Sequence, residues 1–390
     1  MLKLFYVCIF VVTGTSTPFF APYLRKLGLS GQQVSAMLMV APTLQLVVPL
    51  LWGWLADRTR QPHRVLQALC LGAFAASLPI IFVRTMPALL LLFVAQQFFY
   101  VCISPLADSL AVEKARMGGD YSRIRLWGSL SFITVSMLMG LCLDWRGVKT
   151  GDVLVPAVIS VGLALSLFAG LGLKGRGVEP SPHLREVRQL LHDRRFRFLL
   201  VVAGLHWMCL VPYHGFFGIL LQDRGFPARI ISYSFVAGAG AEIMVFLAYS
   251  RLRARIGLLP MFAAVFAVSA LRWWFFAYAQ SAWLIVVTQL LHALTFGLFW
   301  VTCMAWIGGC VPPRLRATGQ VLFSTTLGVG SMVGLLATGA LYDATGGAGI
   351  AFTLAGLLEL LPLAWVLIMR GKLQPVAIKN ARPEPRLRPG

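Results

Sequence analysis

The stretch GWLADRTRQPHR, from Gly53 to Arg64, is a short basic segment between two long apolar runs. Each run has about 20 residues, the length that an α-helix needs to cross a hydrocarbon core of about 30 Å. Such runs recur along the whole chain, and they are continuous rather than alternating, which favours helices over a membrane barrel. The sequence therefore predicts an all-α integral membrane protein with twelve spans, at residues 2–24, 33–56, 64–83, 87–112, 124–143, 153–173, 197–221, 228–250, 257–280, 282–308, 317–341 and 348–369.

The composition is typical of a protein embedded in lipid. Of the 390 residues, 58% are hydrophobic and 12% are charged, whereas a soluble domain has about 25% charged residues. The net charge of +20 suits a nucleic-acid-binding protein only if the basic residues cluster on a soluble domain, and the chain has none. With a cytosolic N-terminus, 26 of the 34 Lys and Arg lie in cytosolic segments, which is the positive-inside pattern. We predict a protein of the bacterial inner membrane with both termini cytosolic, in contact with the bilayer and with no nucleic-acid partner.

The spans fall into two groups of six. The predicted domains are an N-terminal six-helix bundle (1–173), a cytosolic linker (174–196), a C-terminal six-helix bundle (197–369) and a basic tail (370–390) that we expect to be disordered. The linker contains two prolines and then a basic amphipathic piece, which is compatible with a surface helix.

The two halves resemble each other in sequence. FFAPYLRKLG at 19–28 matches FFGILLQDRG at 216–225, and RIRLWGS at 123–129 matches RLRATGQ at 314–320. In the second pair, an R-x-R-x-x-G pattern opens a helix from the cytosolic side in both halves. Parallel repeats of this kind imply a cavity on a pseudo-twofold axis that opens to each side of the membrane in turn.

The segment GWLADRTRQPHR resembles the loop between helices two and three of the major facilitator superfamily, whose pattern is Gly-x-x-x-Asp-Arg followed by basic residues; Pro62 is atypical. With twelve spans and a long central loop, the resemblance covers the whole chain. It implies that Asp57 accepts hydrogen bonds at the N-terminus of span eleven in one of two rocking states. A solvated loop that only sets the topology is the alternative. The predicted gating residues are Gly53, Asp57, Arg58, Arg64, Asp108, Arg123, Arg125, Arg314 and Arg316.

Ionisable residues inside spans are costly and are functional candidates by default. The second half has four such residues. Glu242, His292 and Glu359 are expected near the membrane midplane, and Arg272 is expected somewhat closer to the outer side. The chain also resembles, more narrowly, the phenylpropionate permease group, which is similar to the oligosaccharide–proton symporters. That resemblance rests on YSRIRLWGS (121–129), QLLHALTFG (289–297) and RATGQVLFS (316–324).

The symporter resemblance implies a role for each member of the cluster. Glu242 would bind substrate and proton, Arg272 would be the cation that favours an ionised carboxylate, and His292 would be a hydrogen-bonding relay. Those symporters place a carboxylate three residues after the histidine, where this chain has Thr295. The proton-release role then falls to Glu359 or Glu242, or coupling is absent. A structural ion-pair cluster that fixes helix register is the alternative interpretation.

Other residues in the spans are weaker candidates. Asp108 and Arg125 are on the helices that supply the symporters' sugar contacts, but they lie close to the cytosolic ends, so sugar specificity is not carried over. His206 and His214 are expected in the core or along a cavity rather than at a metal. Most aromatic residues of a membrane protein face lipid or helix interfaces. The predicted cavity-lining residues are Phe19, Phe20, Trp127, Thr295, Phe296 and Trp300.

The predicted function is proton-coupled import of a small organic solute by a monomeric carrier. An aromatic monocarboxylate such as a phenylpropionate is favoured because Arg272 can bind a carboxylate, and a sugar or nucleoside comes next. The first alternative is a proton-antiport exporter, although span five lacks the proline of the exporter motif Gly-x-x-x-Gly-Pro. The second is a non-transporting membrane sensor. No G-x-x-x-x-G-K-[ST] loop occurs, and we predict no enzymatic activity, cofactor or bound metal.

Overall fold

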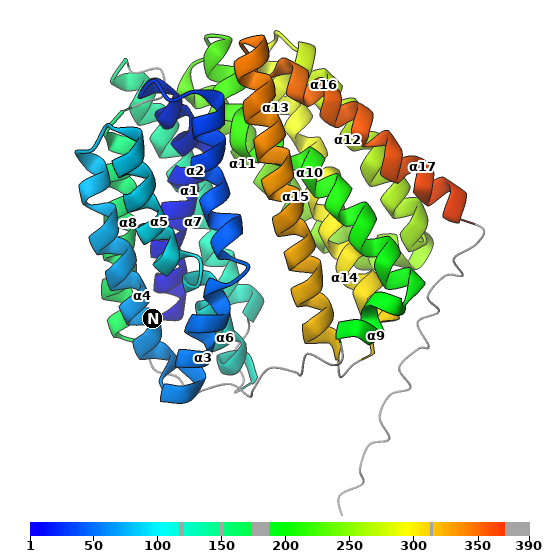
Figure 1. Cartoon of the computed structure of the whole chain (residues 1–390), viewed down its shortest axis with the longest axis horizontal. Coiled ribbons are helices and arrows are strands. Elements are labelled where there is room, and N and C mark those ends of the chain that lie inside the picture. The colour runs from blue at the N-terminus through cyan, green and yellow to red at the C-terminus, as the bar shows by residue number, and fades with distance from the viewer. Residues whose placement is uncertain (117–120, 148–151, 174–186, 313–314, 371–390) are drawn as a thin grey trace, which may run out of the picture.

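The computed structural model describes residues 1–116, 121–147, 152–173, 187–312 and 315–370, and every regular element among them is a helix (Figure 1). Twelve helical segments are long and apolar enough to cross a membrane, which confirms the predicted fold class. The first six spans are α1 (Leu2–Lys26), α2 (Gly31–Leu44) with α3 (Val48–Thr59), α4 (Pro62–Ser77) with η1 (Pro79–Ile81), α5 (Met86–Tyr100) with α6 (Ile103–Arg116), α7 (Tyr121–Trp145) and α8 (Leu154–Leu171). The last six are α10 (Arg194–Asp223), α11 (Ala228–Arg255), α12 (Leu258–Tyr278), α13 (Ala282–Thr288) through α14 (Phe299–Cys310), α15 (Arg316–Thr345), and α16 (Gly349–Leu358) with α17 (Leu360–Met369).

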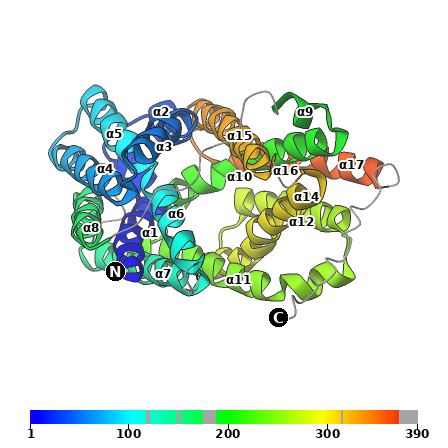
Figure 2. The same ribbon diagram turned by 90° about the horizontal axis from the view of Figure 1, so that it is seen from below.

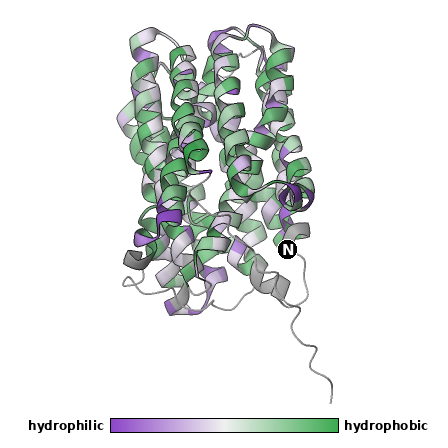
Figure 3. Ribbon diagram, turned by 90° about the vertical axis from the view of Figure 1, so that its right-hand side faces the viewer, coloured by the Kyte–Doolittle hydropathy of each residue, from purple (hydrophilic) through white to green (hydrophobic). Residues whose placement is uncertain are grey.

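The helices form two bundles, with α1 to α8 in one and α10 to α17 in the other (Figure 1). In the first bundle α1 packs on α7 and α8, and in the second α12 packs on α16 and α17. A short helix, α9 (Val187–His192), precedes α10. Residues 174–186 of the predicted linker and 371–390 of the tail lie outside the described residues. Hydrophobic residues follow the length of the helices, and hydrophilic residues gather mainly at their ends (Figure 3).

At the end of the molecule opposite Met1, which we call the far end, carboxylates of one bundle cap helices of the other. The Asp343 carboxylate, at the end of α15, accepts hydrogen bonds from the backbone N–H groups of Gly31 (2.5 Å) and Gln32 (2.9 Å), where α2 begins. The Asp144 carboxylate, at the end of α7, accepts one from the N–H of Ala228 (2.7 Å), where α11 begins. A carboxylate at a helix N-terminus satisfies unpaired N–H groups and is favoured by the helix dipole. The two caps occupy corresponding positions in the two halves.

Small residues let the bundles approach closely below these caps. The Ser35 hydroxyl donates to the backbone oxygen of Leu335 (2.7 Å), and the Ser232 hydroxyl donates to that of Ser136 (2.6 Å). A Cβ atom on Gly339 would lie 2.6 Å from a backbone oxygen of α2, so only glycine fits there. Small residues at helix interfaces in membranes permit this backbone packing. The far end is therefore closed between the bundles.

The end that carries Met1, which we call the Met1 end, is arranged differently. Leu50 and Trp54 on α3 and Val321 on α15 are large, apolar and exposed, although α2 and α15 pack tightly at the far end. No atom lies within 4 Å of the Cβ position of Gly53. The two bundles converge at the far end and diverge towards the Met1 end (Figure 1), and seen from the Met1 end their helices form a ring in which α7 lies next to α11 (Figure 2). The structure is thus closed between the bundles at the far end and open at the Met1 end.

Two spans of the second bundle are irregular at mid-length. Span ten runs from α13 through the 3-10 turn η3 (Gln289–Leu291) and the π-helix η4 (Ala293–Leu298) into α14. Span twelve breaks at Glu359, three residues before Pro362, which has no N–H to continue the helix ladder. Irregular windings inside a helix frequently mark functional positions. Both breaks carry ionisable residues that the sequence singled out.

Candidate functional site

Arg272 on α12 is fully buried, and its guanidinium group is held mainly by span ten. One terminal nitrogen donates to the hydroxyl of Thr295 (2.7 Å), and the other donates to the side-chain oxygen of Gln289 (2.7 Å). The guanidinium carbon also lies 4.4 Å from the centre of the Tyr213 ring. A cation over an aromatic face is stabilised by the ring quadrupole, more so where water is excluded. These contacts replace the water that a buried charge has lost.

His292 connects this cation to a carboxylate. Its Nδ1 lies 3.2 Å from a guanidinium nitrogen of Arg272, and its Nε2 lies 2.9 Å from Oε1 of Glu242 on α11. Because a guanidinium group only donates, Nδ1 accepts, so the proton is on Nε2 and points at the carboxylate. His292 is therefore a neutral bridge between Arg272 and Glu242. This contact explains how a histidine is tolerated in the apolar run QLLHALTFG.

The cluster is graded in exposure. The side chain of Glu242 is 19% exposed and that of His292 is 8% exposed, while Arg272 has no exposure. The imidazole fits because α11 has Gly238 beside it: a Cβ atom there would lie 3.2 Å from the ring. Solvent thus reaches the carboxylate end of the cluster and not the cationic end.

A second polar cluster, which the sequence analysis did not predict, joins His206 on α10 to Glu359 at the break in span twelve. The two side chains are fully buried, with Nδ1 of His206 at 2.8 and 3.1 Å from the carboxylate oxygens. Nε2 lies 2.9 Å from the backbone oxygen of Thr295 and must donate, since a carbonyl only accepts. One further proton is then shared between Nδ1 and the carboxylate. Trp273 also donates to Glu359 (3.3 Å).

Thr295 belongs to both clusters. Its hydroxyl accepts from Arg272, and its backbone oxygen accepts from His206. The residue lies within the π-helix η4, whose wider winding disturbs the regular i to i+4 hydrogen bonds and makes a carbonyl available to another helix. The position at which the chain departs from the symporter pattern is therefore the meeting point of the two clusters.

A signal for the His206–Glu359 pair exists in the sequence. His206 lies twelve residues after the start of α10, and Glu359 lies ten residues before the end of α17. At 1.5 Å per residue, both are roughly 15–18 Å from the Met1 end of their helices. Each buried ionisable residue needs a partner at a similar depth, and this requirement would have predicted the His206–Glu359 pair. The adjacency of α10 and span twelve, however, is a tertiary fact.

We expect replacement of His206 by Ala to destabilise the protein strongly. The change leaves the Glu359 carboxylate buried without its main partner, and removing one partner of a buried ion pair costs about 3–5 kcal/mol. His214→Ala is a matched control, because His214 is on the same helix and makes ring contacts with Trp207 and Tyr213. Thermal unfolding in detergent, followed by circular dichroism, measures the difference. Equal melting temperatures for the two variants would contradict the assignment.

The burial of Arg272 bears on the argument for one predicted substrate class. From the sequence, an aromatic monocarboxylate is favoured because Arg272 could bind its carboxylate. In the structure the guanidinium group has no exposed surface and is already bonded to Thr295, Gln289 and His292. Glu242, by contrast, keeps 19% of its side chain exposed. The structure thus removes the reason for preferring an acid.

The first bundle contributes a cavity of about 320 Å³ with several polar side chains in its lining. Its polar lining consists of Gln45, Gln97, Tyr100, Ser104 and Asp108, which come from the second and fourth spans. Uncharged amide and hydroxyl groups around a cavity at membrane depth are suited to bind hydroxyl groups of a ligand.

Asp108 and Arg125, which were predicted as gating residues, lie close to each other, and Asp108 lines this cavity. The Tyr6 hydroxyl donates to the Asp108 carboxylate, and a guanidinium nitrogen of Arg125 lies 3.7 Å from Oδ1 of Asp108. The guanidinium group also lies over the rings of Tyr6 and Phe10. Asp108 lines the cavity and so is placed where a ligand can meet it.

The predicted cavity-lining aromatics divide into two groups. Phe296 stacks on His292 (5.2 Å between ring centres) and on Trp300 (6.2 Å), beside the exposed side of the cluster. Phe19 and Phe20 are buried in a hydrophobic core to which both bundles contribute, which corrects their prediction as cavity residues. The ring of Phe20 stacks on that of Phe93 on α5 (4.8 Å between ring centres), so it fills space between helices. Trp127 on α7 is exposed and Thr295 is buried in the polar clusters.

The remaining predicted gating residues lie near the Met1 end. Arg58 lies over the ring of Trp54, and Arg64 is exposed at the start of α4. Gly53 stands in open space. The predicted contact of Asp57 with the start of span eleven is not described by the structure. The side chains of Asp57, Arg123 and Arg316 and the whole of Arg314 lie outside the described residues.

Comparison with known proteins places the chain among membrane permeases. The model of the MFS_1 like family matches residues 1–354. The chain is 29% identical over 329 residues to the maltose permease of Geobacillus stearothermophilus, with 82% of each chain covered. It is 27% identical over 327 residues to the "Probable 3-phenylpropionic acid transporter" of Escherichia coli (strain K12), covering 78% of this chain and 81% of that protein.

Solved structures share the fold. The crystal structure of the nucleoside transporter NupG matches with a TM-score of 0.81 at 18% identity, covering 96% of this chain and 98% of that one. A peptide transporter of the POT type matches with a TM-score of 0.75 at 13% identity, covering 95% and 94%. At these identities the likeness concerns the arrangement of the twelve spans.

Proposed function

The chain belongs to the MFS_1 like family, and from this premise we propose that it imports a small hydroxyl-bearing solute, a sugar or a nucleoside, together with protons. It is a membrane-embedded secondary transporter and not an enzyme, as its relatives are permeases and transporters. The predicted resemblance to the major facilitator superfamily is thereby confirmed.

The observation that carries the proposal is the position of Glu242. Its carboxylate is partly exposed, lies halfway along α11, and is joined through His292 to the buried charge of Arg272. A carboxylate that solvent reaches can gain and lose a proton. Arg272, on the other side of His292, keeps its positive charge. Protonation of Glu242 therefore changes the net charge of the Glu242–His292–Arg272 cluster.

Protonation of Glu242 also alters how helices are held. While Glu242 is ionised, the hydrogen bond from His292 is charge-assisted, and such bonds are about twice as strong as neutral ones. That bond joins α11 to span ten. A proton on Glu242 therefore loosens this junction and leaves Arg272 without its counter-charge. Proton binding and helix arrangement are linked, and linkage is reciprocal, so the arrangement also sets the proton affinity.

The substrate class follows from the groups that face the open space. Glu242 and the amide and hydroxyl groups around the cavity of the first bundle accept and donate hydrogen bonds. These groups favour hydroxyl groups, whereas the guanidinium that would hold an acid is buried. A relative is named a maltose permease, which supports this choice, and another is named for 3-phenylpropionic acid, so an aromatic acid is the second candidate.

The state of the structure fits alternating access. We propose that the Met1 end is cytosolic, since this orientation places most Lys and Arg inside. The structure is then inward-open, with Asp144 and Asp343 holding the outer side shut. Release of both caps would let the bundles rock and close the cytosolic side, as in carriers built from repeats.

Uptake into proteoliposomes tests the function. We expect radiolabelled maltose or uridine to accumulate when the outside is more acidic than the inside, and a protonophore to abolish accumulation. Uptake of 3-phenylpropionate alone would favour the acid. Accumulation driven only by the opposite gradient would favour an exporter, and no movement of any of the three would favour a sensor.

A further inference from the structure

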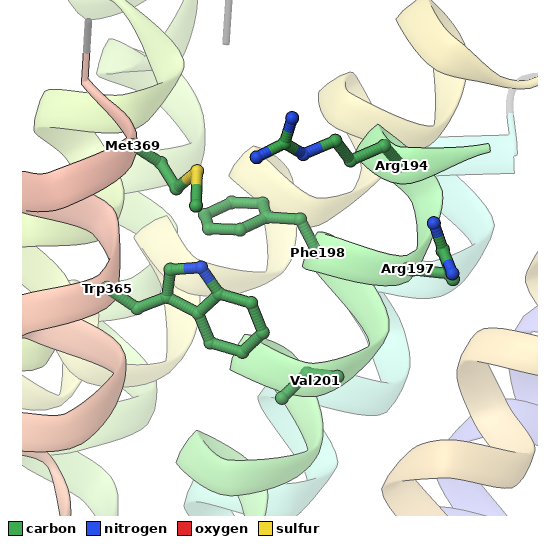
Figure 4. Close-up of a pocket in the computed structure, with 6 residues that line it drawn as sticks. All are labelled: Arg194, Arg197, Phe198, Val201, Trp365 and Met369. Carbon is green, nitrogen blue, oxygen red and sulfur yellow. The ribbon is translucent and has the colours of Figure 1, made fainter. Parts of the chain in front are cut away.

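A groove of about 350 Å³ lies between the Met1 ends of α10 and α17, away from both polar clusters (Figure 4). It combines two basic side chains with an apolar surface. Figure 4 shows the guanidinium group of Arg194 extending towards Met369, above the rings of Phe198 and Trp365. The groove is lined by Arg194, Arg197, Phe198, Val201, Trp365 and Met369.

The groove lies at the level where the hydrocarbon core ends. Arg194 is the first residue of span seven, and Met369 is the last residue of span twelve. Tryptophan is enriched at this level of a bilayer because its ring is apolar and its N–H is polar. Trp365 lies one turn inside the end of α17, with its ring 5.7 Å from that of Phe198. Lipid headgroups and the first part of their chains are therefore the natural neighbours of this surface.

The charge of the groove is not balanced by its own lining. Arg194 and Arg197 are both exposed, and the lining residues include no carboxylate. Asp193 is next to them in sequence, but its carboxylate already accepts from the N–H groups of Arg195 (2.7 Å) and Phe196 (3.1 Å) as the cap of α10. The guanidinium group of Arg194 reaches over the groove, whereas that of Arg197 lies at the rim, on the other side of α10 (Figure 4). A guanidinium group is suited to a phosphate, which it can bind through paired hydrogen bonds.

We propose that this groove binds one anionic phospholipid of the leaflet at the Met1 end. The headgroup phosphate lies at Arg194, Arg197 adds positive charge at the rim, and an acyl chain lies along Phe198, Val201 and Trp365. A free phosphate would use only the two arginines, whereas the lipid uses both halves of the lining. The lipid joins the first and last spans of the second bundle. This proposal does not depend on what the carrier transports.

Native mass spectrometry of the purified full chain tests the proposal, with dioleoyl phosphatidylglycerol as the probe. We expect one molecule of this lipid to be retained, and dioleoyl phosphatidylcholine to be lost under the same conditions. The variant Arg194→Gln/Arg197→Gln should bind the anionic lipid about tenfold more weakly or worse, since each arginine near an anionic surface contributes substantially to binding. Equal retention by this variant and the wild type would overturn the proposal.

Two further comparisons separate the groove from general charge effects. Arg251→Gln/Arg255→Gln removes the same charge from exposed positions at the Met1 end of α11 and should leave lipid retention unchanged. Val201→Trp keeps both arginines but fills the apolar part of the groove, and should reduce retention. Inorganic phosphate should not raise the melting temperature at concentrations where the lipid does. Loss in the α11 control, full retention in the Val201 variant, or protection by phosphate would each count against a lipid site.

Discussion

Replacing Glu242 by Gln should abolish concentrative uptake while preserving exchange. An amide cannot take up a proton, so the gradient no longer drives transport, but its oxygen still accepts the hydrogen bond from Nε2 of His292. With one proton per solute, a gradient of one pH unit supports about tenfold accumulation, because a tenfold ratio corresponds to about 1.4 kcal/mol. The variant should reach a ratio of about one. Radiolabelled uptake and counterflow in proteoliposomes measure the two activities.

The matched control for this variant is Asp152→Asn. Asp152 is also buried and also paired, with Arg146 at 2.7 Å, but it lies at the far end of the first bundle. Its removal should leave the accumulation ratio at the wild-type value. If the Glu242 variant still accumulated solute about tenfold, the cluster would be structural and a different group would carry the proton.

Removing both far-end caps should shift the carrier out of its present state. In the variant Asp144→Ala/Asp343→Ala, the N–H groups of Gly31 and Ala228 lose their side-chain acceptors. A capping carboxylate contributes about 1 kcal/mol. Two such losses change the ratio of the two states by about 30-fold in favour of an open far end. Hydrogen exchange should become faster in the peptides that contain the starts of α2 and α11.

Variants that lack only one of the two caps show whether the caps hold a shared closed state or act only on their own helices. Each alone should speed exchange at both helix starts, because opening the far end separates α2 from α15 and α11 from α7 together. The Asp152→Asn variant serves again as the control. Faster exchange only at the helix that lost its own cap would show that the caps are independent and do not hold a shared state.

The sequence was sufficient for the fold and for one of the two polar clusters. Long apolar runs of the right length predict spans because hydrocarbon demands satisfied backbone groups, and this demand does not depend on the neighbours. Glu242, Arg272 and His292 stood out because a charge at membrane depth needs a partner. The structure does bring these three side chains together.

Other features of the site could not be predicted from the hydrophobic pattern of the sequence, because they depend on how the helices pack against one another. The role of Thr295 as an acceptor for two helices follows from the π-helix, whose winding is set by packing against α11 and α12. The burial of Phe19 and Phe20 depends on which face of α1 meets its neighbours. Hydropathy alone does not distinguish a core face from a cavity face in a helix that is apolar all round.

Sequence by itself determined that this chain crosses a membrane twelve times, that it belongs among the facilitator carriers, and that charge is placed inside its second half. Tertiary structure decided which of those charges are accessible. It buried Arg272 and left Glu242 partly exposed, paired His206 with Glu359, and set two aspartates as caps across the bundles. The physical reason is that hydrophobic length is a local property of the chain, whereas the partner and the solvent exposure of a polar group depend on helices far away in sequence.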